Sequence, residues 1–235
     1  MTGPGYNTSN PEIIYNAGKN SPSFDFSQGM EDLFRTGSSR YIYLAGKDWN
    51  EFDFTRGQEL LEKLLIPEYI YDGGVYWPQF NFNSGFTALM KAAGTDPEYV
   101  YRAGRFWREY DYDRGLEKLI EIHQPRFIFY AGKEWRTFNH ERGSEAICLE
   151  GDPEFIFYAG SHWRGFNYTA GFEALLKARD PEYLYKAGTL WRDFDFSRAW
   201  LFLEKDVTAG ALWRARAMNN ERWMNALKVF WKTLW

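Results

Sequence analysis

A segment of 28 residues recurs along this chain of 235 residues and limits the folds open to it. The copy that begins at Pro97 reads PEYVYRAGRFWREYDY, and the copy that begins at Pro153 reads PEFIFYAGSHWRGFNY. The starts are 28 residues apart except for one step of 30, and they are Pro11, Ser39, Pro67, Pro97, Pro125, Pro153 and Pro181. A period of about 20 to 50 residues is typical of solenoids, in which each repeat buries its apolar face against its neighbours. The sequence therefore predicts an array of seven repeats over residues 11–208.

The repeat also accounts for most of the aromatic residues, which make up 20% of the chain. With the first residue of each repeat as offset 0, aromatic residues recur at offsets 2, 4, 10, 13 and 15, and these columns hold 32 of the 47. Offset 10 alone holds six of the eleven tryptophans, namely Trp49, Trp77, Trp107, Trp135, Trp163 and Trp191. We interpret most of the aromatic excess as core architecture.

Each repeat is predicted to form two short helices. Proline suits the first position of the first helix, where no helical hydrogen bond is lost. Asp96, Asp152 and Asp180 precede that position as N-caps. Apolar offsets 2, 3, 6, 10 and 13 share one face of a helix with about 3.6 residues per turn. The second helix is expected to begin after an Asp or Asn cap at offset 14 and to bury offsets 15, 18, 19 and 22.

Glycine recurs inside both predicted helices, at offset 7 (as in Gly46) and at offset 18 (as in Gly57). Each such glycine costs a helix about 1 kcal/mol relative to alanine, so a repeated compensation is required. We interpret the two columns as small residues that face each other where the helices of one hairpin cross, and that leave room for neighbouring rings.

This pattern resembles the tetratricopeptide class. The spacing of 3, 1 and 3 residues found in the first helix of that class is kept by Val100, Ala103, Gly104 and Trp107. In the second helix Gly115 and Leu119 stand four residues apart, where that class has Ala and Phe. The resemblance implies an all-α fold, a right-handed α-solenoid of seven helix-turn-helix repeats with a C-terminal capping helix. The chain is also similar to uncharacterised repeat proteins of bacteria and bacteriophages, and this similarity implies no function.

The two ends depart from the repeat. Residues 1–10 are predicted to be an N-terminal extension, and the first repeat carries Ser21 in place of tryptophan. Residues 209–235 are predicted to form a C-terminal capping or assembly helix. Its aromatic stripe either covers the last repeat or forms a dimer or partner interface, whose candidate residues are Trp213, Trp223, Leu227, Phe230, Trp231 and Trp235.

Composition excludes several classes of protein. The chain has 28 Lys and Arg against 32 Asp and Glu, a formal charge of −4, which argues against general nucleic-acid binding. It has no apolar run of about 18 residues, so we expect no membrane span. The first residues lack the pattern of a signal peptide. Because Cys148 is the single cysteine, no intrachain disulfide can form, and a cytoplasmic location is predicted.

No pattern in the sequence predicts a catalytic, metal or cofactor site. His123, His140 and His162 fall at three different offsets, and His140 replaces an aromatic core residue. Cys148 falls at an offset that Ile120 occupies in the preceding repeat, so a core role is expected. Glycine motifs that bind phosphates are absent from the sequence. Glu at offset 20 follows Arg at offset 17 by three residues in three repeats, a spacing typical of helix-surface ion pairs. We expect no enzyme activity.

One polar column has no obvious role in the core. Offset 11 carries arginine in four consecutive repeats, an arginine column made of Arg108, Arg136, Arg164 and Arg192. Arg114 and Arg142 at offset 17 add to it. We place the column in the last turn of the first helix, where it either stabilises the helix C-terminus and stacks on rings, or forms a basic stripe that binds an acidic peptide, a phosphate or a nucleotide.

These observations favour a non-enzymatic scaffold or adaptor that binds a protein or peptide, including one that inhibits its partner, through a repeat surface with the arginine column. A first alternative is a protein that sequesters or senses a small anionic ligand such as a nucleotide. A second alternative is a structural protein that self-assembles through the C-terminal helix.

Overall fold

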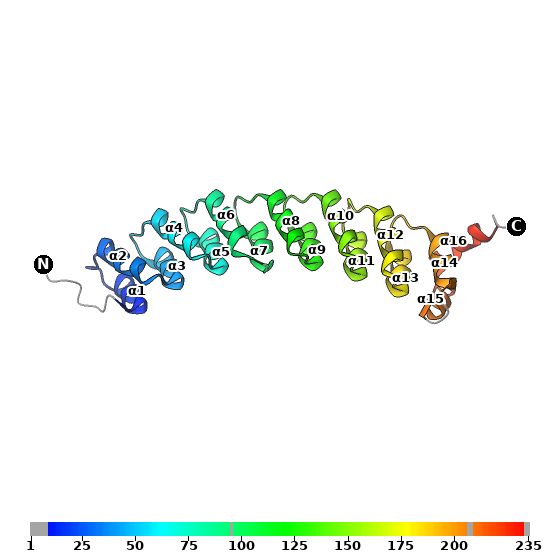
Figure 1. The fold of residues 1–235 in the computed structure, drawn as a ribbon, viewed down its shortest axis with the longest axis horizontal. Coiled ribbons are helices and arrows are strands. Elements are labelled where there is room, and N and C mark those ends of the chain that lie inside the picture. The colour runs from blue at the N-terminus through cyan, green and yellow to red at the C-terminus, as the bar shows by residue number, and fades with distance from the viewer. Residues whose placement is uncertain (1–8, 95, 206–208, 233–235) are drawn as a thin grey trace. The chain divides into compact units, whose positions relative to one another are not determined.

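The computed structural model describes residues 9–94, 96–205 and 209–232. Within these residues every regular element is an α-helix and no strand is present (Figure 1). This result confirms the predicted all-α class. The chain divides into two compact units, a first unit of residues 1–118 and a second unit of residues 119–235.

The helices follow one another in pairs. The first unit contains α1 (Pro11–Asn20), α2 (Phe26–Thr36), α3 (Ser39–Asp48), α4 (Phe54–Leu64), α5 (Pro67–Tyr76), α6 (Phe82–Ala92), α7 (Glu98–Phe106) and the start of α8 (Tyr112–Glu121). The second unit contains the end of α8, and then α9 (Pro125–Glu134), α10 (His140–Glu150), α11 (Pro153–His162), α12 (Tyr168–Ala178), α13 (Pro181–Leu190), α14 (Phe196–Lys205), α15 (Ala209–Met218) and α16 (Glu221–Lys232). Each predicted repeat start coincides with a helix start to within one residue.

Successive pairs pack in two rows within each unit. In the first unit, α1, α3, α5 and α7 pack side by side, and α4 packs on α6. In the second unit, α9, α11 and α13 form one row while α10 packs on α12 (Figure 1). The first helices of the repeats thus form one layer and the second helices the other.

Caps define the helix starts as the sequence predicts. The Asp53 carboxylate accepts a hydrogen bond from Arg56 N (3.0 Å) at the start of α4, and the Asn167 side chain accepts one from Ala170 N (3.0 Å) at the start of α12. At a first helix, Asp152 accepts from Glu154 N (3.0 Å). These bonds satisfy amide groups that have no partner inside the helix.

The first helix is shorter than the apolar periodicity predicts. It ends at offset 9, and the following tryptophan has extended backbone angles, such as φ −82° and ψ 141° at Trp49. The expectation that offsets 10 to 13 continue the helix is therefore wrong. Trp49 N still donates to Ala45 O (2.8 Å), so the helical hydrogen-bond pattern continues one residue beyond the helix.

Within each unit the extended backbone directs the tryptophans of successive repeats into the repeat that precedes them. The indole Nε1 donates to the carbonyl at offset 4 of that repeat, as in Trp49 to Tyr15 (3.1 Å), Trp77 to Tyr43 (3.2 Å), Trp107 to Tyr71 (3.0 Å), Trp163 to Phe129 (3.3 Å) and Trp191 to Phe157 (3.2 Å). The indole therefore links neighbouring repeats by a buried hydrogen bond as well as by apolar contact.

The glycine columns make room for these rings. A Cβ at Gly46 would lie 2.5 Å from Trp77 Cε2, and a Cβ at Gly57 would lie 2.5 Å from Phe52 Cε1. The offset-7 glycine faces the tryptophan of the next repeat, and the offset-18 glycine faces the offset-13 ring of its own loop. The prediction that these glycines leave room for neighbouring rings is confirmed. The prediction that the two columns face each other at the hairpin crossing is wrong, because each column receives an aromatic ring.

Two aliphatic columns form the centre of the hairpins. The offset-3 column is completely buried and consists of Ile14, Ile42, Ile70, Val100, Ile128, Ile156 and Leu184. The offset-22 column is at most 1% exposed and consists of Leu33, Leu61, Leu89, Leu119, Ile147, Leu175 and Leu203. Together they supply the apolar burial that holds each pair of helices together.

The C-terminal segment forms two helices, α15 and α16, where the sequence predicted one. A tight turn at Asn219 and Asn220 separates them, and the Asn220 side chain caps α16 by accepting from Trp223 N (3.2 Å). Trp223 Nε1 donates to Tyr185 O (3.3 Å), and its indole faces Gly188. Trp223 thus occupies the position that the tryptophan of a further repeat would take, and α16 caps the last hairpin.

Candidate functional site

The arginine column lies in loops, not in the last turn of the first helix as predicted. Each arginine comes directly after the tryptophan that follows the first helix, and all four side chains are exposed. The Arg108 guanidinium lies 5.6 Å from the Phe82 ring centroid, which agrees with a stacking role for this arginine. Within the residues that the structure describes, the side chains of Arg136, Arg164 and Arg192 form no ion pair and no ring contact.

The offset-17 arginines lie near carboxylates or aromatic rings. The Arg114 guanidinium lies 4.8 Å from the Phe86 ring and 4.0 Å from the Asp111 carboxylate. Arg142 pairs with Glu145 at 3.4 Å on the same helix, as predicted. Arg56, in contrast, pairs with Glu31 of the preceding repeat at 2.5 Å, so in this repeat the prediction of a pair within one helix is wrong.

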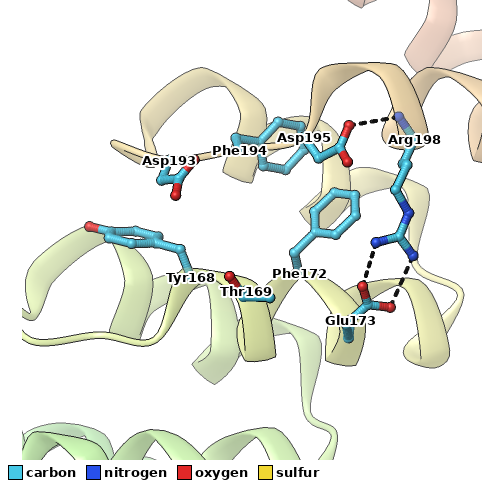
Figure 2. A pocket seen from close by; sticks show the side chains of 8 residues that line it. All are labelled: Tyr168, Thr169, Phe172, Glu173, Asp193, Phe194, Asp195 and Arg198. Atoms are coloured by element: carbon cyan, nitrogen blue, oxygen red, sulfur yellow. Dashed lines mark hydrogen bonds and ion pairs between the residues drawn. The ribbon is translucent and has the colours of Figure 1, made fainter.

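A groove between the second helices brings the arginines together with aromatic residues. In the second unit it lies between α12 and α14, and Figure 2 shows its lining side chains. Phe172 and Phe194 form its floor, with their ring centroids 5.2 Å apart in an edge-to-face arrangement. Arg198 closes one end by donating two hydrogen bonds to Glu173, of 2.5 and 3.1 Å. These bonds lower the pKa of Glu173.

The same groove occurs in the first unit between α6 and α8. Phe86 and Tyr110 form its floor, also edge to face at 5.2 Å, and Tyr110 is fixed because its hydroxyl donates to Val100 O (2.8 Å). The groove is lined by Phe82, Asn83, Phe86, Glu109, Tyr110, Asp111 and Arg114. These residues occupy the offsets that line the α12–α14 groove, so equivalent positions of the repeat form both grooves.

The size of the grooves limits what they can bind. The α12–α14 groove holds about 130 Å³ and the α6–α8 groove about 250 Å³. Sites for cofactors and drug-sized ligands hold about 300 to 1,000 Å³, so each groove has room for a side chain. A wider, open depression of about 460 Å³ lies between α4 and α6, but its charged side chains are Glu62 and Lys91, whose charges cancel.

The predicted interface residues fall into three groups. Trp213, Trp223 and Leu227 are buried, and Tyr185 stacks on Trp223 with ring centroids 5.9 Å apart. Phe230 and Trp231 are half-buried, and Trp231 contacts Trp200 edge to face at 5.8 Å. Trp235 lies outside the described residues. The buried members are therefore part of the cap and not open to a partner.

The candidate reactive residues have packing roles. The His140 ring lies 5.1 Å from Phe138 and 5.5 Å from Trp163, and burial lowers the pKa of its imidazole. Burial raises the pKa of the Cys148 thiol to about 11, which disfavours the thiolate that a nucleophile requires. In the described part of the chain no three His, Cys, Asp or Glu side chains are grouped so that they could hold a metal ion. None of the described helices is long and apolar enough to span a membrane.

A comparison with protein-family models, with curated proteins and with solved structures found no match to this chain. We therefore interpret the candidate site from its geometry alone.

The groove could not be predicted from the sequence, because its two walls come from different repeats. Glu173 and Arg198 are 25 residues apart, which is one repeat less three residues, and the same interval separates Glu31 from Arg56. Recurrence of opposite charges at that interval is the signal that could have revealed the contact.

Proposed function

We propose that this chain is a non-enzymatic scaffold that binds a protein or peptide along the surface made by its second helices and the adjoining loops. The observation that carries the proposal is the groove of side-chain size that recurs at the same offsets in both units. A repeated series of small, aromatic-floored grooves suits the side chains of an extended partner better than it suits one compact ligand.

The arginine column supplies the polar anchors of this surface. Arg108 precedes the groove residue Glu109 and stacks on Phe82, and Arg192 holds the same offset beside the α12–α14 groove. Exposed arginine beside aromatic rings is enriched among the residues that contribute most to protein interfaces. Because the guanidinium is a planar fork of donors, it favours carboxylate-bearing partners.

The test separates binding from folding. Peptides selected from a random displayed library on the wild-type chain are titrated against the triple variant Arg136→Ala, Arg164→Ala, Arg192→Ala. Because these side chains have no partner in the described structure, we expect the Tm to stay unchanged while the affinity falls about tenfold or more.

Arg222→Ala is the matched control for a structural arginine. Arg222 donates to Thr189 O (3.0 Å) and to Trp191 O, so its removal leaves carbonyl groups at the end of α13 without their partner. We expect this variant to lower the Tm. Failure to select any peptide on the wild type would reject the scaffold function, and equal affinity of the triple variant would reject the anchoring role of the column.

Self-assembly through the cap is a second candidate, favoured by exposed apolar side chains on α14 to α16. Leu201 is 46% exposed, Leu212 54%, Met218 54% and Val229 65%. The expected result for this candidate is a dimer mass by light scattering, which Leu212→Glu with Val229→Glu converts to a monomer mass. A monomer mass for the wild type at about 100 μM would exclude an interface of ordinary affinity.

A further inference from the structure

The chain itself shows twice how the offset-17 arginine receives a carboxylate. Glu31 accepts from Arg56 at 2.5 Å, and Glu173 accepts from Arg198 at 2.5 and 3.1 Å. In both places the glutamate is at offset 20 of one repeat and the arginine at offset 17 of the next. Hydrogen bonding from the arginine lowers the pKa of Glu31 and of Glu173, so both carboxylates are held in the charged form.

The α6–α8 groove lacks that glutamate. Offset 20 of this repeat is Thr87, whose hydroxyl donates to Asn83 O (3.1 Å) on its own helix. Arg114 is left with the Asp111 carboxylate at 4.0 Å, a distance that is too long for a hydrogen bond, and with the Phe86 ring. Among the residues that the structure describes, no side chain accepts a hydrogen bond from this guanidinium, so its donors are available to the groove.

The space in the groove agrees with the missing side chain. The α6–α8 groove holds about 250 Å³, against about 130 Å³ for the groove in which Glu173 is present (Figure 2). Phe82, Phe86 and Tyr110 provide apolar contact for the methylene groups of an entering side chain, and Arg108 lies over the outer ring, Phe82.

The charges favour one carboxylate over a doubly charged phosphate. The α6–α8 groove already contains Glu109 and Asp111, which balance Arg108 and Arg114. One additional carboxylate would give the groove the same excess of one negative charge that is found around the α12–α14 groove. There Glu173, Asp193 and Asp195 stand beside Arg192 and Arg198. A phosphate would add about two negative charges to the same site.

We infer that the α6–α8 groove binds the carboxylate of a glutamate or aspartate side chain of the partner, at the position that Glu173 occupies in the α12–α14 groove. This inference rests on the proposed scaffold function and specifies the chemistry of one of its sites. It also distinguishes the two grooves, because one is open to an acidic side chain and its equivalent is filled by Glu173 of the chain itself.

The experiment uses arrayed peptides of twelve residues in matched pairs. Each pair differs only by glutamate or glutamine at one position, with no other acidic residue and with an amidated C-terminus. The labelled wild-type chain should bind a subset of the glutamate peptides about tenfold or more tightly than their glutamine twins, which is the range of a charge-assisted hydrogen bond.

Variants at Thr87 identify the groove. Thr87→Glu places a carboxylate of the chain itself on Arg114 and should abolish the preference for glutamate, whereas Thr87→Val removes the hydroxyl without filling the groove and should retain it. Glu173→Thr opens the α12–α14 groove and should create a second site with the same preference. Far-ultraviolet circular dichroism and the Tm show that each variant is folded.

If the wild type binds peptides but does not distinguish glutamate from glutamine, the carboxylate site is rejected while the scaffold function stands. If Thr87→Glu keeps the preference, the α6–α8 groove is not its origin. If the wild type binds no peptide of the array, both proposals fail.

Discussion

Replacing Gly46 with alanine tests whether the tryptophans set the spacing between repeats. In an isolated helix this change is favourable by about 1 kcal/mol, because alanine is the better helix former. In this chain Gly46 lies beneath the indole of Trp77, which is 1% exposed, and a new Cβ would lie 2.5 Å from Trp77 Cε2. Ordinary contact requires about 3.4 Å or more, so the indole must move by roughly 1 Å.

The cost of that movement has two parts. Overpacking of a filled core costs about 1 to 3 kcal/mol. The shift also strains the hydrogen bond from Trp77 Nε1 to Tyr43 O (3.2 Å), whose loss costs about 0.5 to 1.5 kcal/mol. Subtracting the helix-propensity gain of about 1 kcal/mol leaves a net loss of about 0.5 to 3.5 kcal/mol in the free energy of unfolding.

Urea unfolding followed by circular dichroism measures this loss. Asn16→Ala, at an exposed position of α1, is the control for helix propensity and should stabilise the chain slightly. In a Trp77→Phe background the smaller ring leaves room for the methyl group. The cost of Gly46→Ala should therefore fall there by about 0.5 kcal/mol or more, a coupling that a double-mutant cycle detects. A neutral or stabilising Gly46→Ala, with no coupling to Trp77, would refute the assignment of this column to ring packing.

Three further experiments test other parts of the structure. Trp223→Ala should cost about 3 to 5 kcal/mol in urea unfolding, because it empties the buried position over Gly188; a loss below about 1 kcal/mol would show that α16 is not an essential cap. Arg179→Gly should raise the free energy of unfolding by about 1 kcal/mol, because Arg179 has a left-handed φ of 56°. Gly151→Ala, at the equivalent position with a φ of 75°, should lower it. A change of Tm in the same direction for both variants would contradict this reasoning. Burial lowers the pKa of His140 below its unfolded value near 6.5, so the unfolded chain takes up the proton first and wild-type stability falls as the pH drops from 7.5 to 5. In parallel urea titrations His140→Phe should remove the part of this pH dependence that comes from the imidazole. An identical pH dependence of both chains would exclude a contribution of His140.

The sequence was sufficient for the parts of the fold that local rules control. The 28-residue period, proline at the helix start and caps such as Asp53 and Asn167 act within a few residues, so the number and order of helices in the repeats follow from them. The end of the first helix could not be read in this way. Trp49 continues both the apolar periodicity and the backbone hydrogen bond to Ala45, although its own backbone is extended.

The candidate site was only half predictable. The sequence identified Arg108 and Arg114, because an unexplained charge recurs at a fixed offset. It did not identify the aromatic floor or Thr87. The contacts that form the groove join residues of different repeats that are 22 to 25 positions apart, as in Phe172 with Phe194 and Glu173 with Arg198. Thr87 stands where other repeats have a glutamate that can pair with the offset-17 arginine of the next repeat. Its significance therefore becomes clear only when that pairing is known.

The tryptophan contacts also bear on how a second protein can bind. Within each unit the tryptophan of one repeat lies over the offset-7 glycine of the repeat before it, so a further copy that joined the last repeat in the same way would place a tryptophan over Gly188. That position is filled by Trp223, with Tyr185 stacked on the indole and Arg222 fixed on the end of α13. The first repeat, moreover, offers Ser21 where the others have tryptophan. The contact that joins successive repeats is thus occupied at the last repeat, and its tryptophan is missing from the first, so we expect a partner to bind at the grooves and loops that carry the exposed arginines.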